Sequence, residues 1–145
     1  MHGRPKFLLF LLRISLGWIF FYSGITKIFN SAWSAKGFLE AAKTLPDLFA
    51  LLASPQNIGW VNFVNEWGQL LIGAALILGV FASAAAWSAI LLMLLYYLPG
   101  LNFPYVANGY LIDEHIIFIL ALLILIRTRA GKFFSLGSIF RSSEF

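Results

Sequence analysis

Residues that could do chemistry stand at the start of one apolar segment of this sequence. From Ile116 to Ile126 every side chain is a hydrocarbon, yet Asp113, Glu114 and His115 come directly before this run. Acidic residues at a helix N-terminus are favoured by the helix dipole, and Asp can cap the first N–H groups. That interpretation accounts for Glu114. Asp113 and His115 can also belong to a polar site, in which the imidazole exchanges a proton near neutral pH.

Three further ionisable residues, Arg13, Lys27 and Glu66, lie inside apolar segments. Such residues are costly inside a membrane span and are functional-site candidates. At the helical rise per residue, Lys27 lies about 21 Å beyond Arg13, toward the outer side. Glu66 lies near the start of the second apolar segment, and Asp113–His115 lie at the start of the fourth. Both segments enter the membrane from that same outer side. The alternative for the two cations is that they extend to the headgroups on their own sides of the membrane.

We therefore predict a polar cluster that combines residues from three helices in the outer leaflet. Lys27 and His115 are the candidate catalytic residues. Arg13 shares a helical stripe with Lys27 but lies nearer the inner side. The full candidate set is Arg13, Lys27, Glu66, Asp113 and His115.

Aromatic residues are expected at the same outer level. Trp67 follows Glu66 directly, and Tyr110 stands shortly before Asp113. These two are the candidates for an aromatic pocket that holds a flat ring beside the polar cluster. The alternative is the ordinary belt of Trp and Tyr at a membrane interface.

The elements that must position these residues follow from composition. The chain has 145 residues, of which 61% are hydrophobic and 11% charged. Soluble domains carry about 25% charged residues, so the sequence predicts an integral membrane protein with one domain over residues 1–145. Spans of about 20 apolar residues fit at 7–29, 61–80, 82–98 and 111–126. The expected fold is an all-α four-helix transmembrane bundle.

Basic residues predict the orientation. They flank the start of the first span and follow the last one, which places both termini in the cytoplasm. The net charge of +4 is therefore an orientation signal and not a nucleic-acid footprint. The first outer loop, 30–60, has an amphipathic pattern that predicts one short surface helix ending near Pro46. Gly17, Gly24 and Gly73 predict close contact between the first two spans.

The cofactor classes are limited by the absence of cysteine. The only histidines are His2 and His115. Thiolate metal sites, iron–sulfur ligation and bis-histidine haem ligation within one chain are therefore excluded. We expect no metal and no covalently bound cofactor, and we expect quinone only as a substrate.

The order of motifs resembles the DoxX/DoxD family of small membrane proteins. The resemblance rests on "RISLGWIFFYSGITKIF", "NEWGQLLIGAALILGVF" and "IDEHIIFILALLILI" followed by "AGKFFSLGSIF", and it covers nearly the whole chain. It implies a four-helix bundle. DoxD-like members are associated with thiosulfate:quinone oxidoreductase and a second small subunit, and other relatives with redox-stress complexes.

Three functions follow as hypotheses. The first is a quinone-linked oxidoreductase subunit, in which Lys27 or His115 bonds a quinone carbonyl and Glu66 or Asp113 relays a proton. The second is a non-catalytic scaffold or assembly factor, and the third is a small-solute transporter. The expected partners are the lipid bilayer and a second small subunit or a redox protein, with a homo-oligomer left open. The expected location is the plasma (inner) membrane of a bacterium or archaeon.

Overall fold

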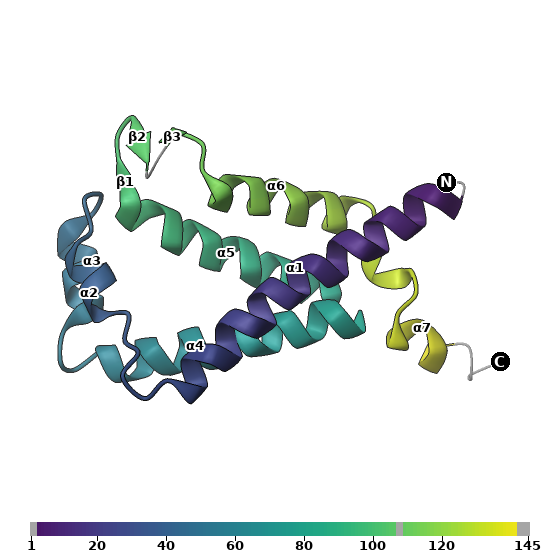
Figure 1. Cartoon of the computed structure of the whole chain (residues 1–145), viewed down its shortest axis with the longest axis horizontal. Coiled ribbons are helices and arrows are strands. Elements are labelled where there is room, and N and C mark those ends of the chain that lie inside the picture. Colours follow the sequence, from purple (N-terminus) through teal and green to yellow (C-terminus); the bar gives the residue numbers. More distant parts are fainter. Residues whose placement is uncertain (1–2, 107–108, 142–145) are drawn as a thin grey trace.

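A computed structural model describes residues 3–106 and 109–141 of the chain, and they are mostly helical (Figure 1). His2 and Phe145 lie outside the described residues. The elements in chain order are α1 Gly3–Phe29, α2 Lys36–Glu40, α3 Pro46–Ala53, α4 Ile58–Leu78, α5 Ala82–Gly100, β1 Leu101–Asn102, β2 Tyr105–Val106, β3 Gly109–Tyr110, α6 Glu114–Arg127, the 3₁₀ helix η1 Ala130–Lys132, and α7 Leu136–Arg141.

Three of the helices, α1, α4 and α5, are long and apolar enough to cross a membrane. Their limits agree with the predicted spans to within four residues. The fourth predicted span, 111–126, is helical only from Glu114, and α6 has 14 residues. At the helical rise per residue this is about 21 Å, which is shorter than a bilayer core of about 30 Å.

Glycines set the contact between α1 and α4. A Cβ atom on Gly73 would lie 2.2 Å from the Phe21 nitrogen, and one on Gly24 would lie 2.4 Å from the Leu70 nitrogen. A Cβ on Gly17 would lie 3.0 Å from the Gly73 oxygen. The two backbones therefore approach more closely than any larger residue would permit. The predicted contact through small residues is confirmed.

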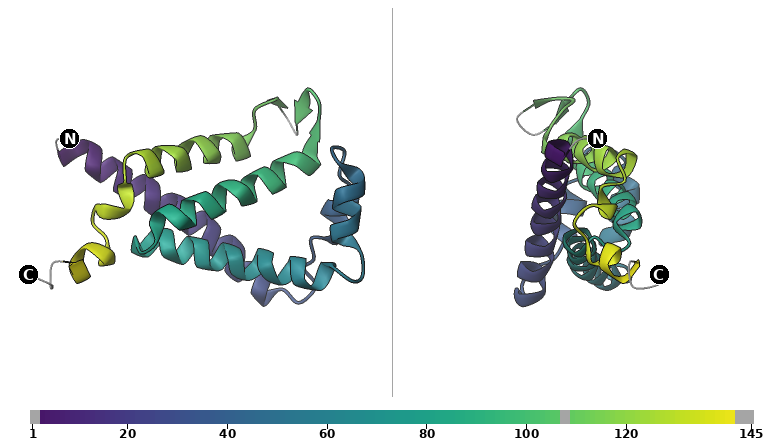
Figure 2. Two further views of the ribbon diagram at one scale, coloured as in Figure 1. Left: turned by 180° about the vertical axis from the view of Figure 1, so that it is seen from behind. Right: turned by 90° about the vertical axis from the view of Figure 1, so that its right-hand side faces the viewer.

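The second helix pair is α5 and α6, which lie side by side while α1 crosses them obliquely (Figures 1 and 2). Ala86, Ala89, Leu122 and Leu125 are buried between them and the other helices. Small residues on α5 let α6 pack closely against it. The start of α1 and the segment from η1 to α7 lie at one end of the molecule, and α2, α3 and the strands lie at the other (Figure 1).

Two expectations about the loops need correction. The first loop contains two short helices instead of one, because Pro46 occupies the N-terminal turn of α3, where its fixed φ suits a helix start. The fold is also not purely helical, since β1, β2 and β3 form a small antiparallel sheet. Strands of two residues carry no periodic signal that sequence reasoning could detect.

Candidate functional site

Lys27 lies at the centre of a hydrogen-bond network that joins three helices. It stands in the last turn of α1, and its Nζ donates to Gln69 Oε1 at 2.7 Å and Tyr96 Oη at 2.9 Å. A third bond, of 3.2 Å, goes to Asn65 Oδ1. A lysine ammonium has three donors, so every one of them has an acceptor.

The acceptors are fixed to one another as well. Asn65 and Gln69 are four residues apart on α4 and therefore share one helical face. Tyr96 Oη donates to Asn65 Oδ1 at 2.6 Å and accepts from Gln69 Nε2 at 3.3 Å. Gln69 is 3% exposed, whereas Lys27, Asn65 and Tyr96 are half-buried, so the network is only partly shielded from its surroundings.

Sequence reasoning missed two of these partners. Asn65 and Tyr96 are absent from the candidate set predicted from the sequence. Glu66, which was assigned, forms no ion pair with Lys27 in the described part of the chain. Adjacent residues on a helix point about 100° apart, so the rotation of α4 decides between Asn65 and Glu66. The i, i+4 spacing of Asn65 and Gln69 was the available signal.

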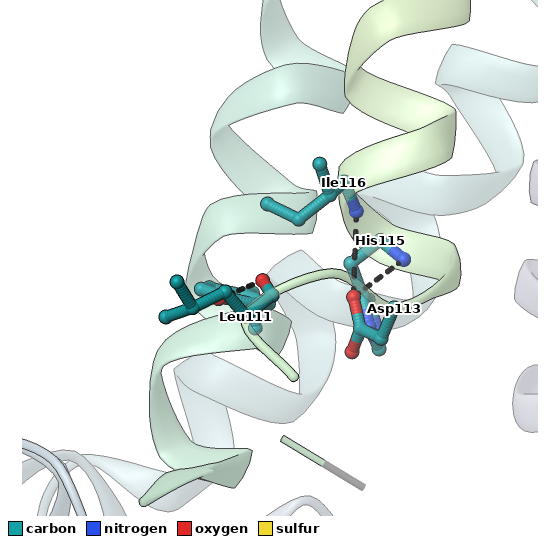
Figure 3. Close-up of polar contacts among 5 residues, drawn as sticks. Leu111, Asp113, His115 and Ile116 are labelled. Atoms are coloured by element: carbon teal, nitrogen blue, oxygen red, sulfur yellow. Dashed lines mark hydrogen bonds and ion pairs between the residues drawn. The ribbon is translucent and has the colours of Figure 1, made fainter. Parts of the chain in front are cut away.

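Asp113 and His115 form a second polar unit at the start of α6 (Figure 3). Asp113 Oδ1 accepts from the backbone nitrogens of His115 at 2.9 Å and Ile116 at 3.4 Å, which caps the helix. Its Oδ2 lies 2.8 Å from His115 Nδ1. Both interpretations of this acidic start therefore hold for Asp113, because it is a cap and also the partner of the imidazole.

The two units meet at Tyr96. Its ring stacks on the His115 ring, with centroids 6.2 Å apart and planes 20° from parallel. Beside this contact is a cavity of about 240 Å³ among the four long helices. Its polar lining residues are Ser23, Lys27, Gln69, Tyr96, Glu114 and His115, and its apolar ones are Ile19, Phe20, Met93 and Phe118.

The size and lining of this cavity limit its ligand. Sites for drug-sized molecules measure about 300–1,000 Å³, so 240 Å³ suits a single ring. The aromatic and aliphatic side chains favour an apolar ring, and the polar groups on one side favour oxygen substituents. We call this space, with Lys27, Tyr96 and His115 on its wall, the ring pocket.

The two aromatic candidates from the sequence lie elsewhere. Trp67 is 42% exposed and packs beside Phe63 on the outer face of α4. Tyr110 is 63% exposed and meets Tyr105 edge-on in the small sheet. Neither lines the ring pocket. Both were predicted from their sequence neighbours, Glu66 and Asp113. Trp67, however, lies on an exposed face of α4, and Tyr110 lies in the strand β3.

Trp33 is the aromatic residue that sequence reasoning did not select. Lys27 Nζ lies 4.8 Å from the centre of its ring, a distance typical of a cation–π contact. Trp33 belongs to the connection between α1 and α2 and packs with the cluster that α2 and α3 form. The connection between α1 and α2 therefore contacts the Lys27 network through Trp33.

Arg13 is separate from this cluster. It is fully buried, and its guanidinium donates to the carbonyls of Ala130 at 2.7 Å, Phe133 at 2.9 Å and Phe134 at 3.1 Å. Its Nε is buried without a partner among the described residues. Arg13 thus fixes the segment after α6 to α1, at the end of the molecule away from Lys27.

Asp113, Glu114 and His115 also hold ligand atoms within 4.8 Å of one another, which is close enough for a metal ion. The Asp113 oxygens, however, already accept from two backbone amides and face His115 Nδ1. Glu114 is exposed. The arrangement is explained as a cap with an oriented histidine, and the expectation that no metal is bound stays a prediction.

Comparison with known proteins identifies a family. The model of the DoxX family matches residues 8–99, from α1 to the last turn of α5. No curated protein and no solved structure matches the chain. The matched region includes Lys27, Asn65, Gln69 and Tyr96, and it ends before Asp113 and His115.

Proposed function

Because this chain belongs to the DoxX family, we propose that it is a membrane subunit of a quinone-linked oxidoreductase, with the quinone head in the ring pocket. The observation that carries the proposal is the His115 ring, oriented by Asp113, which lies with the part-buried Lys27 on the wall of a cavity of single-ring size. The thiosulfate:quinone type, the DoxD-like branch, follows from the resemblance alone.

The proposed setting is a four-helix bundle in the plasma membrane with both termini in the cytoplasm. The apolar outer faces of α1, α4 and α5 support this setting. In it, α6 completes the bundle as a shorter fourth helix whose polar start lies at the depth of Lys27. The ring pocket would then face the outer leaflet, where an isoprenoid tail can extend between helices into lipid.

His115 is the proposed proton carrier. All three Lys27 donors have acceptors, so a ligand gains no free donor from that side chain. His115 Nδ1 faces the Asp113 carboxylate, which favours the tautomer with its proton on Nδ1 and leaves Nε2 for the ligand. Asp113 also stabilises the imidazolium that forms when Nε2 takes up a proton.

Reduction of a quinone to a quinol consumes two electrons and two protons. A donor such as thiosulfate would supply the electrons, since two thiosulfate ions release two electrons when they join through a new S–S bond. His115 Nε2 would deliver one proton to a quinone oxygen, be reprotonated from water at its side chain, which is 24% exposed, and then deliver the second proton to the other oxygen. Lys27 acts as a positioning residue whose positive charge favours the electron-rich product.

The test is quinone retention. Protein purified in mild detergent from quinone-containing membranes is analysed by mass spectrometry, with His115→Gln, Lys27→Met and Asp113→Asn beside the unchanged protein. We expect stoichiometric quinone in the unchanged protein and loss in all three variants. Matched controls are Lys36→Met and Asp47→Asn, because both residues are exposed and lie outside the ring pocket. Equal trace quinone in every sample would contradict the proposal.

A second candidate function is a non-catalytic scaffold, and the saturation of Lys27 favours it. A network in which every Lys27 donor already has an acceptor is suited to fixing the register of the helices. In that case Lys27→Met lowers the thermal unfolding temperature but leaves the quinone content unchanged. Deletion of residues 127–145 would then lose protein partners in a pull-down, because the basic end of the chain would recruit them.

A further inference from the structure

A second, larger cavity lies at the opposite end of the molecule from the ring pocket. It measures about 740 Å³ and lies between the α4–α5 turn and the segment from η1 to α7. We call it the basal cavity. Its polar lining side chains are Ser83, Arg129, Lys132, Ser135 and Ser138, and none of the described lining residues is acidic. Cationic and hydroxyl donors without a carboxylate fit an anion.

The start of α5 adds to this electropositive wall. Ala82, Ser83 and Ala84, the first three residues of this 19-residue helix, all line the basal cavity. The N-cap residue is Phe81, whose side chain offers no capping hydrogen bond. The first N–H groups of an α-helix have no acceptor inside the helix and carry the positive end of its dipole. An anion in the cavity would supply the missing acceptor.

Arg13 lies beside Gly79 of the cavity wall and has a buried donor without a partner among the described residues. Arg13 is fully buried, its three acceptors are neutral carbonyls, and it pairs with no carboxylate in the described structure. Its unpartnered Nε belongs to a side chain that borders a small void of about 10 Å³. Ala82, Ser83 and Gly131 line both this void and the basal cavity. A buried cation without a counter-charge is costly, and an anion nearby would offset that cost.

Ser135 and Gly79 shape the site. Ser135 is 5% exposed, and its Oγ accepts from the Ser138 nitrogen at 3.1 Å, so the hydroxyl proton is left for another acceptor. Gly79 adopts a left-handed φ of 71°, and a Cβ there would lie 3.0 Å from an Arg13 guanidinium nitrogen and 2.3 Å from Ser135 Cβ. Only glycine lets the cavity wall approach Arg13 so closely.

We propose that the basal cavity binds a phosphate group, carried either by an anionic lipid headgroup or by a water-soluble phosphate compound. The size of 740 Å³ lies within the range of about 300–1,000 Å³ for small-molecule sites and exceeds what a bare ion fills. Exposed Phe81 on the rim offers an apolar surface for the first carbons of an acyl chain. This inference does not rest on quinone binding.

The test is native mass spectrometry of the full chain in a neutral detergent. Phosphatidylglycerol, phosphatidylcholine and glycerol phosphate are added separately. We expect phosphatidylglycerol to bind. The double variant with Arg129→Gln and Lys132→Gln should bind it roughly 10- to 30-fold more weakly, since each near-surface cation contributes modestly to the affinity for an anionic lipid. The matched control, Arg127→Gln, removes an exposed cation that does not line the cavity.

A second variant, Ser83→Asp, distinguishes loss of phosphate binding from loss of folding. A carboxylate in the first turn of α5 favours the helix, so the thermal unfolding temperature should hold or rise while phosphate binding is lost. Binding of glycerol phosphate but not of the lipid would assign the site to a soluble ligand. Two results would overturn the proposal. One is equal retention of phosphatidylglycerol and phosphatidylcholine together with no binding of glycerol phosphate. The other is a loss of binding in Arg127→Gln as large as that caused by changing Arg129 and Lys132.

Discussion

The rings of Tyr96 on α5 and His115 on α6 stack with centroids 6.2 Å apart. The hydroxyl of the same Tyr96 accepts from Lys27 on α1 and donates to Asn65 on α4. One tyrosine therefore connects side chains of all four long helices. A shift of any one helix changes the wall of the ring pocket, which makes the network suited either to sense a ligand or to hold the bundle in register.

The Tyr96 hydroxyl should contribute to stability apart from its ring. Tyr96→Phe keeps the stacking surface but leaves Lys27 Nζ and Asn65 Oδ1 each without one partner. We expect the free energy of unfolding to fall by about 1–3 kcal/mol, measured by denaturant titration in detergent micelles. Tyr22→Phe is the control, because Tyr22 is 58% exposed. Equal effects of the two changes would contradict the importance of the network.

The two roles of Asp113 can be separated. Asparagine caps a helix about as well as aspartate, so Asp113→Asn should leave the unfolding temperature nearly unchanged, whereas Asp113→Ala should cost about 1 kcal/mol. Asparagine cannot stabilise an imidazolium as a carboxylate does. If His115 carries the proton, Asp113→Asn should slow quinone reduction by roughly 100-fold. An unchanged rate would leave Asp113 as a cap only.

The α1–α4 contact predicts opposite effects at two glycines of one helix. Gly73→Ala places a methyl group against the Phe21 backbone, whereas a Cβ at Gly68 meets nothing within 4 Å. We expect Gly73→Ala to lower the free energy of unfolding by about 3 kcal/mol or more. Gly68→Ala should raise it by about 0.5–1 kcal/mol, because alanine is the better helix former. Equal effects in thermal unfolding would contradict the close contact.

Arg13 should hold the chain after α6 in place. Arg13→Met leaves the Ala130, Phe133 and Phe134 carbonyls without their donor, at a cost of about 3 kcal/mol or more. We expect the segment to detach, and trypsin to cleave after Lys132 faster than in the unchanged protein. Arg127→Met is the control, since Arg127 is exposed in the last turn of α6. Unaltered cleavage in Arg13→Met would exclude this anchoring role.

The orientation prediction needs a separate experiment. A reporter fused after Phe145 should be found in the cytoplasm, because basic residues precede the first span at Lys6 and follow the last predicted span at Arg127 and Lys132. A fusion within the connection between α1 and α2 should lie on the outer side. Fluorescence of a folding-sensitive reporter distinguishes the two locations. A C-terminal reporter outside the cytoplasm would also reverse the proposed depth of the ring pocket.

The sequence by itself determined the membrane character, the approximate limits of the long helices, the α1–α4 glycine contact and the cap at Asp113. These features depend on composition, on residues that share one helical face, or on neighbours within a single turn. Each is a short-range property, so the order of residues is enough to predict it. The two-residue strands were missed because two residues are too few to show a periodic pattern. The helix α3 was missed because Pro46 was interpreted only as a helix end, although proline also suits the first turn of a helix.

Only the tertiary structure decided the partners of Lys27 and Arg13. Lys27 meets Asn65 instead of Glu66 because one residue step turns a helix by about 100°, and the glycine contact fixes that rotation. Arg13 meets carbonyls 117 to 121 residues away along the chain. Backbone carbonyls occur at every position, so no residue type marks them as partners, and only the path of the chain after α6 brings these three together.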